Sequence, residues 1–468
     1  MMQPVATRGS SRARIIEPAC PHCSARARDG EEFTFHALLQ VIVSNPNAAA
    51  RLCRASERGL RRWCRLRTRA SSTAIQKLHD AKHYKNARRA RAEHLARLEV
   101  QVDALFMAAR KRWRTRQSQS EVEREVIRQK RLRAVFDKLP EVGRLTRPAR
   151  ARQFLIKKDN NRGTRLITSF YWVDRARQIM LRSALSPFAD LHDAQYMLAR
   201  DANRRGPAAV REALLTALER CDANWEFIHL DVVDFYGSIS QGWLERHLGL
   251  DPAIIQHQVH LGRMMLDAPR KMATVLATQE AIREGDQRGI PQGSALSSLI
   301  AEQVMAAVIR SAVVFEELPT FIWSDNVGVL APRHRVREVV ELARTAFADH
   351  GAGPFKLTVT TWPVSKPFKF LGVWYIRRED KPDALVPWEV LNAWQASIAS
   401  RLQLCWGHEI DAIEHAVDKK LARWRWCPDA RRTVRAVRRL IASRRSQFSE
   451  RETNRMARAE DGVMPLLA

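Results

Sequence analysis

The sequence predicts an α+β fold in which a strand-bearing centre lies between two helical regions. Strands are indicated by an apolar, β-rich run at residues 226–232 and by two short apolar runs that flank a polar triplet at 324–326. Helices are indicated on both sides of this centre, where apolar residues recur at helical spacing. We therefore expect a helical extension at 1–150, a central region at 151–380 and a second helical region at 381–468.

The extension is strongly basic. The whole chain has 79 Lys and Arg residues against 51 Asp and Glu residues, and 34 of the basic but only 14 of the acidic residues lie within 1–150. Residues 51–70 and 87–117 combine apolar positions at helical spacing with intervening arginines, which predicts basic amphipathic helices. Such a charge surplus attracts polyanions, so we expect these helices to contact the phosphates of a structured RNA or of a template strand. A solvated helical bundle is the alternative.

The seven cysteines are scattered and odd in number, which favours a reducing compartment over a disulfide framework. Cys20 and Cys23 form one C-x-x-C pair, with His22, His36 and Cys53 in the same part of the chain. Because no second C-x-x-C pair follows, the sequence leaves open whether zinc binds there. No apolar run reaches the ~18 residues that cross a bilayer, so we expect a cytoplasmic protein without membrane contact.

Two aspartates of the central region lie in settings that suit phosphoryl transfer. Asp231 ends the predicted strand EFIHLDV, and Asp325 lies at the tip of a hairpin predicted between FIW and VGVLA. Two carboxylates on adjacent strands repel one another unless a divalent cation lies between them, and Mg²⁺ needs only a few carboxylates beside substrate phosphates. For either residue alone, the alternative is a strand end or a simple turn.

A bent loop followed by a helix separates the two aspartates. In GIPQGSALSS, residues 289–298, two glycines and a proline fix the bend, and Ser297 or Ser298 is expected to cap the helix that follows. Backbone N–H groups are exposed where a loop opens a helix, and Gln292 adds a side-chain amide for a sugar or a base edge. Alone, the segment is also typical of an ordinary loop and core helix.

In this order, the segments resemble the reverse transcriptases, specifically the bacterial group that includes group II intron maturases, retron enzymes and the related proteins of antiviral (phage) defence. The resemblance covers about residues 150 to 380. LDVVDFYGSI is similar to motif A of that family, IPQGSALS to motif B, and KFLGVWYI to the F-L-G strand of the primer grip. It implies a right-hand polymerase with palm and fingers in 151–380 and a helical thumb in 381–468, where 388–448 predicts three helices.

The resemblance also implies roles for single residues. Asp231 and Asp325 would hold the catalytic metal ions together with the backbone carbonyl of Val232. Tyr236 would lie under the incoming sugar and reject a 2′-hydroxyl, with core packing as the alternative. Gln292 would line the template and nucleotide pocket. Lys356, in FKLTV, would donate a proton to pyrophosphate, unless it is only a solvent-facing lysine.

Upstream, residues 155–185 are similar to the fingers of these enzymes. Lys158 and Arg165 are expected on neighbouring strands of a hairpin, where a lysine point charge and an arginine fork suit a triphosphate. Lys157 competes with Lys158 for this role. The alternative is a solvated charged turn.

The chain departs from the family at one important position. Where the family has Y-x-D-D, this sequence has Trp-Ser-Asp-Asn at 323–326. Asn326 keeps an oxygen that can coordinate a cation but removes one negative charge, which weakens metal capture and could favour Mn²⁺ over Mg²⁺. We expect Asp231, Asp325 and Asn326 to form an active catalytic centre.

The predicted function is RNA-directed DNA synthesis by two-metal nucleotidyl transfer, with Mg²⁺ as cofactor and Mn²⁺ as a possible substitute. The expected partners are an RNA template or structured RNA, a DNA primer or product, and dNTPs. Two alternatives stay open: a template-independent or protein-primed DNA polymerase of the defence type, and a catalytically decayed palm that serves as an RNA-binding scaffold. The template, the primer and the biological setting are left open by the sequence.

Overall fold

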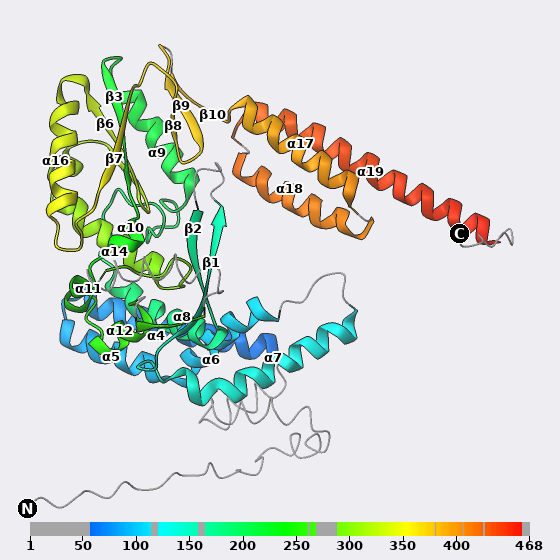
Figure 1. The fold of residues 1–468 in the computed structure, drawn as a ribbon, viewed down its shortest axis with the longest axis horizontal. Coiled ribbons are helices and arrows are strands. Elements are labelled where there is room, and N and C mark those ends of the chain that lie inside the picture. Colours follow the sequence, from blue (N-terminus) through cyan, green and yellow to red (C-terminus); the bar gives the residue numbers. More distant parts are fainter. Residues whose placement is uncertain are drawn as a thin grey trace, which may run out of the picture.

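Helices and strands both build the chain, and the predicted α+β fold class is confirmed. Figure 1 shows the helices that precede β1 at the bottom, the main sheet at the upper left and three C-terminal helices at the upper right. The computed structural model describes residues 57–113, 120–157, 164–260, 263–267, 288–379, 381–405, 407–424 and 426–460. The candidates Lys158, Cys20, Cys23 and Cys53 lie outside these described residues.

Four helices form the described part of the basic extension. The long helix predicted over 87–117 is divided into two helices, because the backbone is extended at Arg97 (ψ 129°). The apolar sides of the extension's helices share one core with helix α8 of the central region, and Leu60, Leu105 and Met180 belong to this core. The extension therefore packs directly onto the central region. The helices are α4 (Glu57–Asp80), α5 (Tyr84–Ala96), α6 (Leu98–Arg112) and α7 (Glu121–Val142).

The predicted fingers hairpin is present. Strand β1 (Arg150–Lys157) pairs antiparallel with β2 (Thr164–Phe170), and the short β4 (Met265–Asp267) pairs parallel with β1. Helix α8 (Trp172–Leu185) follows β2 directly and is amphipathic. Four further elements are η1 (Ser186–Phe188), α9 (Pro207–Arg220), α11 (Gln241–His247) and α12 (Pro252–Gln258).

The main sheet is antiparallel and has the order β5-β6-β3-β7. Its chain order, strand, helix, two strands, helix and strand, is that of a split βαβ unit. This is the region predicted as the palm. Its strands are β3 (Trp225–Val232), β5 (Thr320–Trp323), β6 (Asn326–Pro332) and β7 (Leu357–Pro363), and its helices are α14 (Ser297–Arg310) and α16 (Val336–Asp349). The short α10 (Phe235–Ser238), α15 (Val314–Glu317) and η4 (Arg333–Arg335) connect them.

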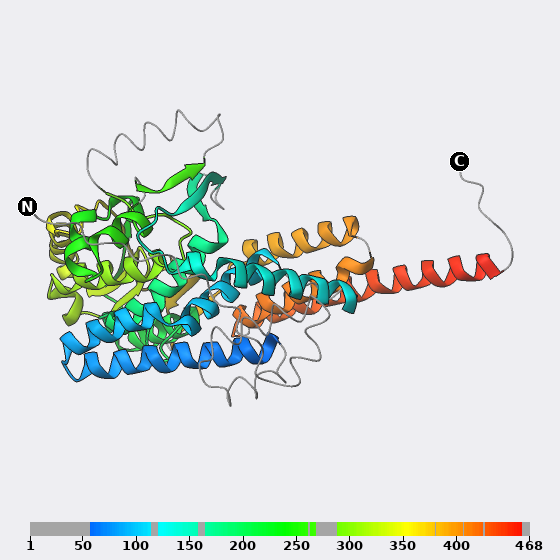
Figure 2. The same cartoon turned by 90° about the horizontal axis from the view of Figure 1, so that it is seen from below.

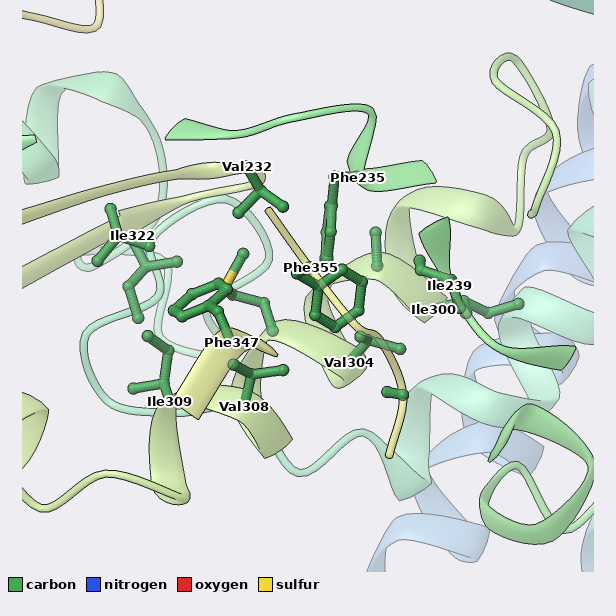
Figure 3. Close-up of a cluster of buried hydrophobic side chains, with 14 of the residues drawn as sticks. Val232, Phe235, Ile239, Ile300, Val304, Val308, Ile309, Ile322, Phe347 and Phe355 are labelled. Atoms are coloured by element: carbon green, nitrogen blue, oxygen red, sulfur yellow. The ribbon is translucent and has the colours of Figure 1, made fainter. Parts of the chain in front are cut away.

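The two faces of β3 have different partners, because successive side chains of a strand point to opposite faces. Ile228, Leu230 and Val232 belong to the core between the sheet and its two helices. Figure 3 shows Phe347 and Phe355 in this core, with Val232 on one side and helix residues of α14 on the other. The alternate positions, including that of Asp231, therefore lie on the opposite face of the sheet.

A small second sheet, β10-β9-β8, packs on that opposite face. The segment KFLGVWYI was predicted as one strand, and this prediction is wrong. It forms a hairpin of β8 (Phe368–Phe370) and β9 (Val373–Arg377), because Leu371 and Gly372 both adopt positive φ, 48° and 79°. Strand β10 (Pro382–Leu385) completes the sheet.

Three helices follow, as predicted for the thumb. They pack through residues such as Ile398, Val417 and Val437, and the last helix extends well beyond the other two (Figure 2). None of the helices in the described part of the chain is both long and apolar enough to cross a membrane. The helices are α17 (Trp388–Leu404), α18 (Ile410–Trp424) and α19 (Pro428–Glu460), with the short η5 (Gly407–Glu409) before α18.

Candidate active site

The two candidate aspartates meet at one end of the main sheet. Asp231 of β3 lies directly opposite Asn326 of β6, and the backbone N–H of Val232 donates to the carbonyl of Asp325 at 3.2 Å. Directly opposite residues of an antiparallel pair have Cβ atoms about 4.5–5.5 Å apart on the same face. The structure therefore brings Asp231, Asp325 and Asn326 together, as the sequence predicted, and all three are half-buried.

Asp325 lies in a two-residue hairpin turn. Trp323 pairs with Asn326, so that only Ser324 and Asp325 connect the strands, and Ser324 adopts a left-handed φ of 57°. Glycine or asparagine usually occupies such a position, so a serine there needs support from its surroundings. That support comes from Glu302 of α14, whose Oε1 accepts a hydrogen bond from the Ser324 N–H at 3.1 Å.

Glu302 is fully buried, and sequence reasoning missed it. Its second carboxyl oxygen accepts a hydrogen bond from Nε2 of Gln195 at 2.8 Å. Burial raises the pKa of Glu302 to about 7, and the nearby Asp325 adds to this rise, while the bonds from Ser324 and Gln195 oppose it. The available signal was a single acid within the apolar helical run SSLIAEQVMAAVI, since glutamate is rarely buried without a partner.

The amide of Asn326 is hydrogen bonded at both ends. Its Oδ1 faces Nε2 of His229 at 3.0 Å, and its Nδ2 donates to Oδ1 of Asp325 at 3.1 Å. This oxygen accepts one hydrogen bond and keeps a second lone pair, so its coordination of a cation stays a prediction. His229 is a second residue that sequence reasoning missed.

Tyr236 lies next to this turn. Its phenol lies near the side chain of Ser324, and its backbone carbonyl accepts from the N–H of Ile290 at 2.8 Å. Burial raises the pKa of Tyr236, and the charges of Asp325 and Glu302 act in the same direction. The ring is therefore held beside the carboxylates in its neutral form, as a residue that shapes the site.

The loop at 289–296 connects the hairpin of β1 and β2 to the segment after β3. The N–H of Gly289 donates to the carbonyl of Ile239 at 2.8 Å, and the carbonyl of Gln292 accepts from the N–H of Thr168 in β2 at 2.7 Å. Gly293 has a φ of +112°, and a Cβ there would lie 2.4 Å from the Thr168 carbonyl oxygen. Only glycine fits this close approach, so the loop is positioned by the strand that it touches.

Helix α14 starts differently from the prediction. Leu296 is the N-cap and makes no side-chain capping bond, so the prediction of a cap at Ser297 or Ser298 is wrong. Instead, the hydroxyl of Ser294 accepts from the N–H of Leu296 at 3.1 Å, and Oε1 of Gln178 accepts from the N–H of Ala295 at 3.2 Å. These two bonds hold the last residues of the loop just before the helix begins.

The remaining predicted residues lie on surfaces around this centre. Arg165 is exposed on β2, opposite Ile156 of β1. Lys356 is exposed just before β7, and its carbonyl accepts from the N–H of Val233 at 2.9 Å. In the part of the chain that the structure describes, no group of three or more His, Cys, Asp or Glu side chains is gathered to hold a metal ion.

No protein-family model matches this chain, and no curated protein matches it. Solved structures are similar at low identity. They include telomerase from Candida albicans in complex with a telomeric RNA fragment, with 13% identity, 65% of this chain and 56% of that chain covered, and a TM-score of 0.34. The RNA-dependent RNA polymerase of a human picobirnavirus has 11% identity, with 51% of this chain and 45% of that chain covered, and a TM-score of 0.31. The insertion-loop deletion mutant of that polymerase has 11% identity, with 50% of this chain and 46% of that chain covered, and a TM-score of 0.33. The chain thus spans about half the length of these structures. A likeness at these TM-scores is too weak to carry a function.

Proposed function

We propose that this chain is an RNA-directed DNA polymerase that uses two-metal nucleotidyl transfer. The observation that carries the proposal is the pairing of Asp231 with Asn326 at the end of the main sheet, which places Asp325 in the adjoining turn. A polymerase needs two carboxylates at one edge of a nucleotide site. The loop at 289–296, bonded to the carbonyls of Tyr236 and Ile239, supplies a fixed wall beside them.

The donor set suits a hard divalent cation. Two carboxylates and the backbone carbonyl of Val232 are oxygen ligands, which Mg²⁺ prefers, and Mg²⁺ completes its shell with water and substrate phosphates. Asp231, Asp325 and Val232 would hold the ions, with Mn²⁺ as a substitute. Bound there, the ions would activate the attacking 3′-hydroxyl and stabilise the leaving oxygen.

The chain's own residues would position the other reactants. Tyr236 would lie under the sugar of the incoming dNTP, and Gln292 would line the template side of the pocket. Arg165 would contact the triphosphate, and Lys356 would serve as the proton donor to pyrophosphate. The exposed arginines of α19 would hold the phosphates of a primer-template duplex, since residues 419–458 carry 14 basic and 3 acidic side chains.

Primer extension tests the proposal. With poly(rA) and oligo(dT), in Mg²⁺ and in Mn²⁺, the wild type should incorporate dTTP, and Asp231→Asn or Asp325→Asn should abolish incorporation. RNA binding, measured by fluorescence anisotropy, should persist in both variants. Asp234→Asn is the matched control, because Asp234 is an exposed carboxylate in the same segment, three residues after Asp231, and should keep full activity. Full activity of either site variant would contradict the assignment.

The same assay separates the alternatives. Incorporation without any template would favour the template-independent polymerase. Asn326→Asp should lower the Mg²⁺ concentration needed by roughly ten- to hundredfold, because one added charge strengthens metal binding by on the order of 1–3 kcal/mol. If neither wild type nor Asn326→Asp incorporates nucleotide with any template or metal, the RNA-binding scaffold is the better account.

A further inference from the structure

A chain of two hydrogen bonds connects the middle of β3 to the carboxylate of Asp325. His229 Nε2 lies 3.0 Å from Oδ1 of Asn326, and Nδ2 of Asn326 lies 3.1 Å from Oδ1 of Asp325. Because Asn326 Oδ1 can only accept, the imidazole donates through Nε2. The order of donors is therefore fixed from His229 through Asn326 to Asp325.

The imidazole of His229 is held in place by its neighbours. Its ring stacks on Trp362 of β7, with centroids 6.4 Å apart and planes 25° apart, and meets the edge of Phe370 at 5.6 Å. Its direct partner on β6 is Gly328, which has no side chain to compete for this space. A Cβ at position 328 would lie 2.6 Å from the ring of Phe227, so glycine is required there.

The direction of the Asn326 amide matters because its two ends have nearly the same shape but opposite polarity. With Nδ2 toward Asp325, the amide donates to the carboxylate. Turned over, its oxygen would face another oxygen, and the Asp325 carboxylate would lose a donor. An N–H donor placed on the far side of the amide makes the first orientation the favourable one.

We propose that His229 is a positioning residue, which fixes the Asn326 amide so that it orients Asp325 for metal binding. The inference rests on the proposed function, in which Asp325 is a metal ligand. It assigns Asn326 to the support of that ligand, in place of the second carboxylate of the Y-x-D-D turn. It also gives β3 a second site residue, two positions before Asp231 and on the same face of the sheet.

Mn²⁺ binding without nucleotide, followed by the electron paramagnetic resonance signal of free Mn²⁺, tests the inference on the full chain. His229→Phe keeps a ring that can stack but loses the donor, and should weaken Mn²⁺ binding by about tenfold, the worth of one hydrogen bond to a polar group. His229→Gln loses the ring but keeps an N–H donor, and should stay within about threefold of the wild type. A packing role predicts the opposite order.

A double-mutant cycle with Asn326→Ala adds a second criterion. In the Asn326→Ala background there is no amide to orient, so His229→Phe should change Mn²⁺ binding by less than about twofold. An equal loss in both backgrounds, or no loss in either, overturns the inference, and so does a wild type that binds no Mn²⁺. His247→Phe is the matched control, because His247 also stacks on a tryptophan, Trp243 at 4.2 Å, outside the site, and should bind Mn²⁺ as the wild type does.

The two proposals fail in different ways. If the Mn²⁺ cycle comes out as expected but the wild type incorporates no nucleotide, the positioning role stands and the polymerase assignment is wrong. If the wild type incorporates nucleotide but His229→Phe binds Mn²⁺ normally, the positioning role is wrong and the polymerase assignment stands. Should His229→Phe not fold, the Mn²⁺ affinity of His229→Gln decides, since a loss beyond about tenfold contradicts the role.

Discussion

The buried carboxylate of Glu302 accepts a hydrogen bond from the backbone N–H of Ser324, 3.1 Å away. This contact joins the helix beneath the main sheet to the residue just before Asp325. Ser324 holds a left-handed φ of 57°, a conformation that costs of order 1–3 kcal/mol unless the surroundings fix it. Glu302 is thus part of what keeps Asp325 in place.

Replacing Glu302 should therefore disturb both stability and activity. In Glu302→Leu the N–H of Ser324 is left buried without its acceptor, which should lower the free energy of unfolding by about 1–3 kcal/mol. Asp325 should shift with the turn, and kcat for dNTP incorporation should fall by about tenfold or more, because small misplacements of reacting groups are costly. Urea unfolding and steady-state primer extension measure the two effects.

Gln303→Leu is the control for a polar-to-leucine change on the same helix. Its amide reaches only the carbonyl of Phe188, at 3.5 Å, away from the turn. This variant should keep wild-type kcat. A fall in kcat equal to that of Glu302→Leu would show that the effect comes from the helix as a whole.

The expected rejection of ribonucleotides depends on the position of Tyr236. Tyr236→Ala removes the ring expected under the sugar, so the ratio of rNTP to dNTP incorporation should rise by about ten- to hundredfold, the usual range for the loss of a steric contact in a pocket. Tyr236→Phe keeps the ring and loses only the hydroxyl group. It should leave the ratio within about threefold of the wild type. An unchanged ratio in Tyr236→Ala would make the residue a packing residue.

The local parts of the site could be predicted from the sequence. The strand that ends at Asp231, the hairpin that carries Asp325 and the bent loop at 289–298 all depend on apolar runs and on glycine and proline, which act over a few residues. The fingers hairpin that carries Arg165 was predicted for the same reason. These patterns also indicated the three C-terminal helices. They were predicted within residues 388–448, whereas α19 extends to Glu460.

The supporting residues could not be predicted in the same way. Glu302 acts on Ser324 across the packing of helix and sheet, and His229 acts on Asn326 only because the strand register places Gly328 opposite it. Register and helix packing are set by long-range contacts, which a single sequence does not display. The hairpin at KFLGVWYI was missed because Leu371 is not a residue that signals positive φ.

A glycine pair tests whether the loop at 289–296 is positioned by its contact with β2. Gly293 and Gly206 both have positive φ, 112° and 106°, but a Cβ would meet the Thr168 carbonyl at 2.4 Å only at Gly293. Gly206→Ala should cost the backbone strain alone, about 1–3 kcal/mol. Gly293→Ala should lose more stability and also reduce dNTP incorporation. Similar losses of stability and activity in both variants would mean that the close contact at Gly293 has no effect of its own.

The last prediction concerns pH. His94 is fully buried between Oγ of Ser71 and Oγ of Ser183, at 3.0 and 2.8 Å, in the core that joins the extension to α8. Burial, with a smaller effect from Arg97, lowers the pKa of His94 from 6.5 to about 4. Below pH 6.5 the unfolded chain binds a proton at this residue, whereas the folded chain does so only near pH 4. Its contribution to the free energy of unfolding is therefore constant above pH 6.5 and falls by about 3 kcal/mol between pH 6.5 and 4.

Urea unfolding at pH 7.0, 5.5 and 4.5 checks this dependence. The wild type should lose stability across this series, and so should any variant that keeps His94. In His94→Gln, which has no titratable group, stability at pH 7.0 should be lower, but the difference from the wild type should shrink by about 2–3 kcal/mol as the pH falls to 4.5. Burial also lowers the pKa of His260 to about 4, but His260 is the same in both proteins, so its effect cancels in the comparison. A difference that stays constant from pH 7.0 to 4.5 would show that His94 takes up its proton at the same pH in the folded and the unfolded chain.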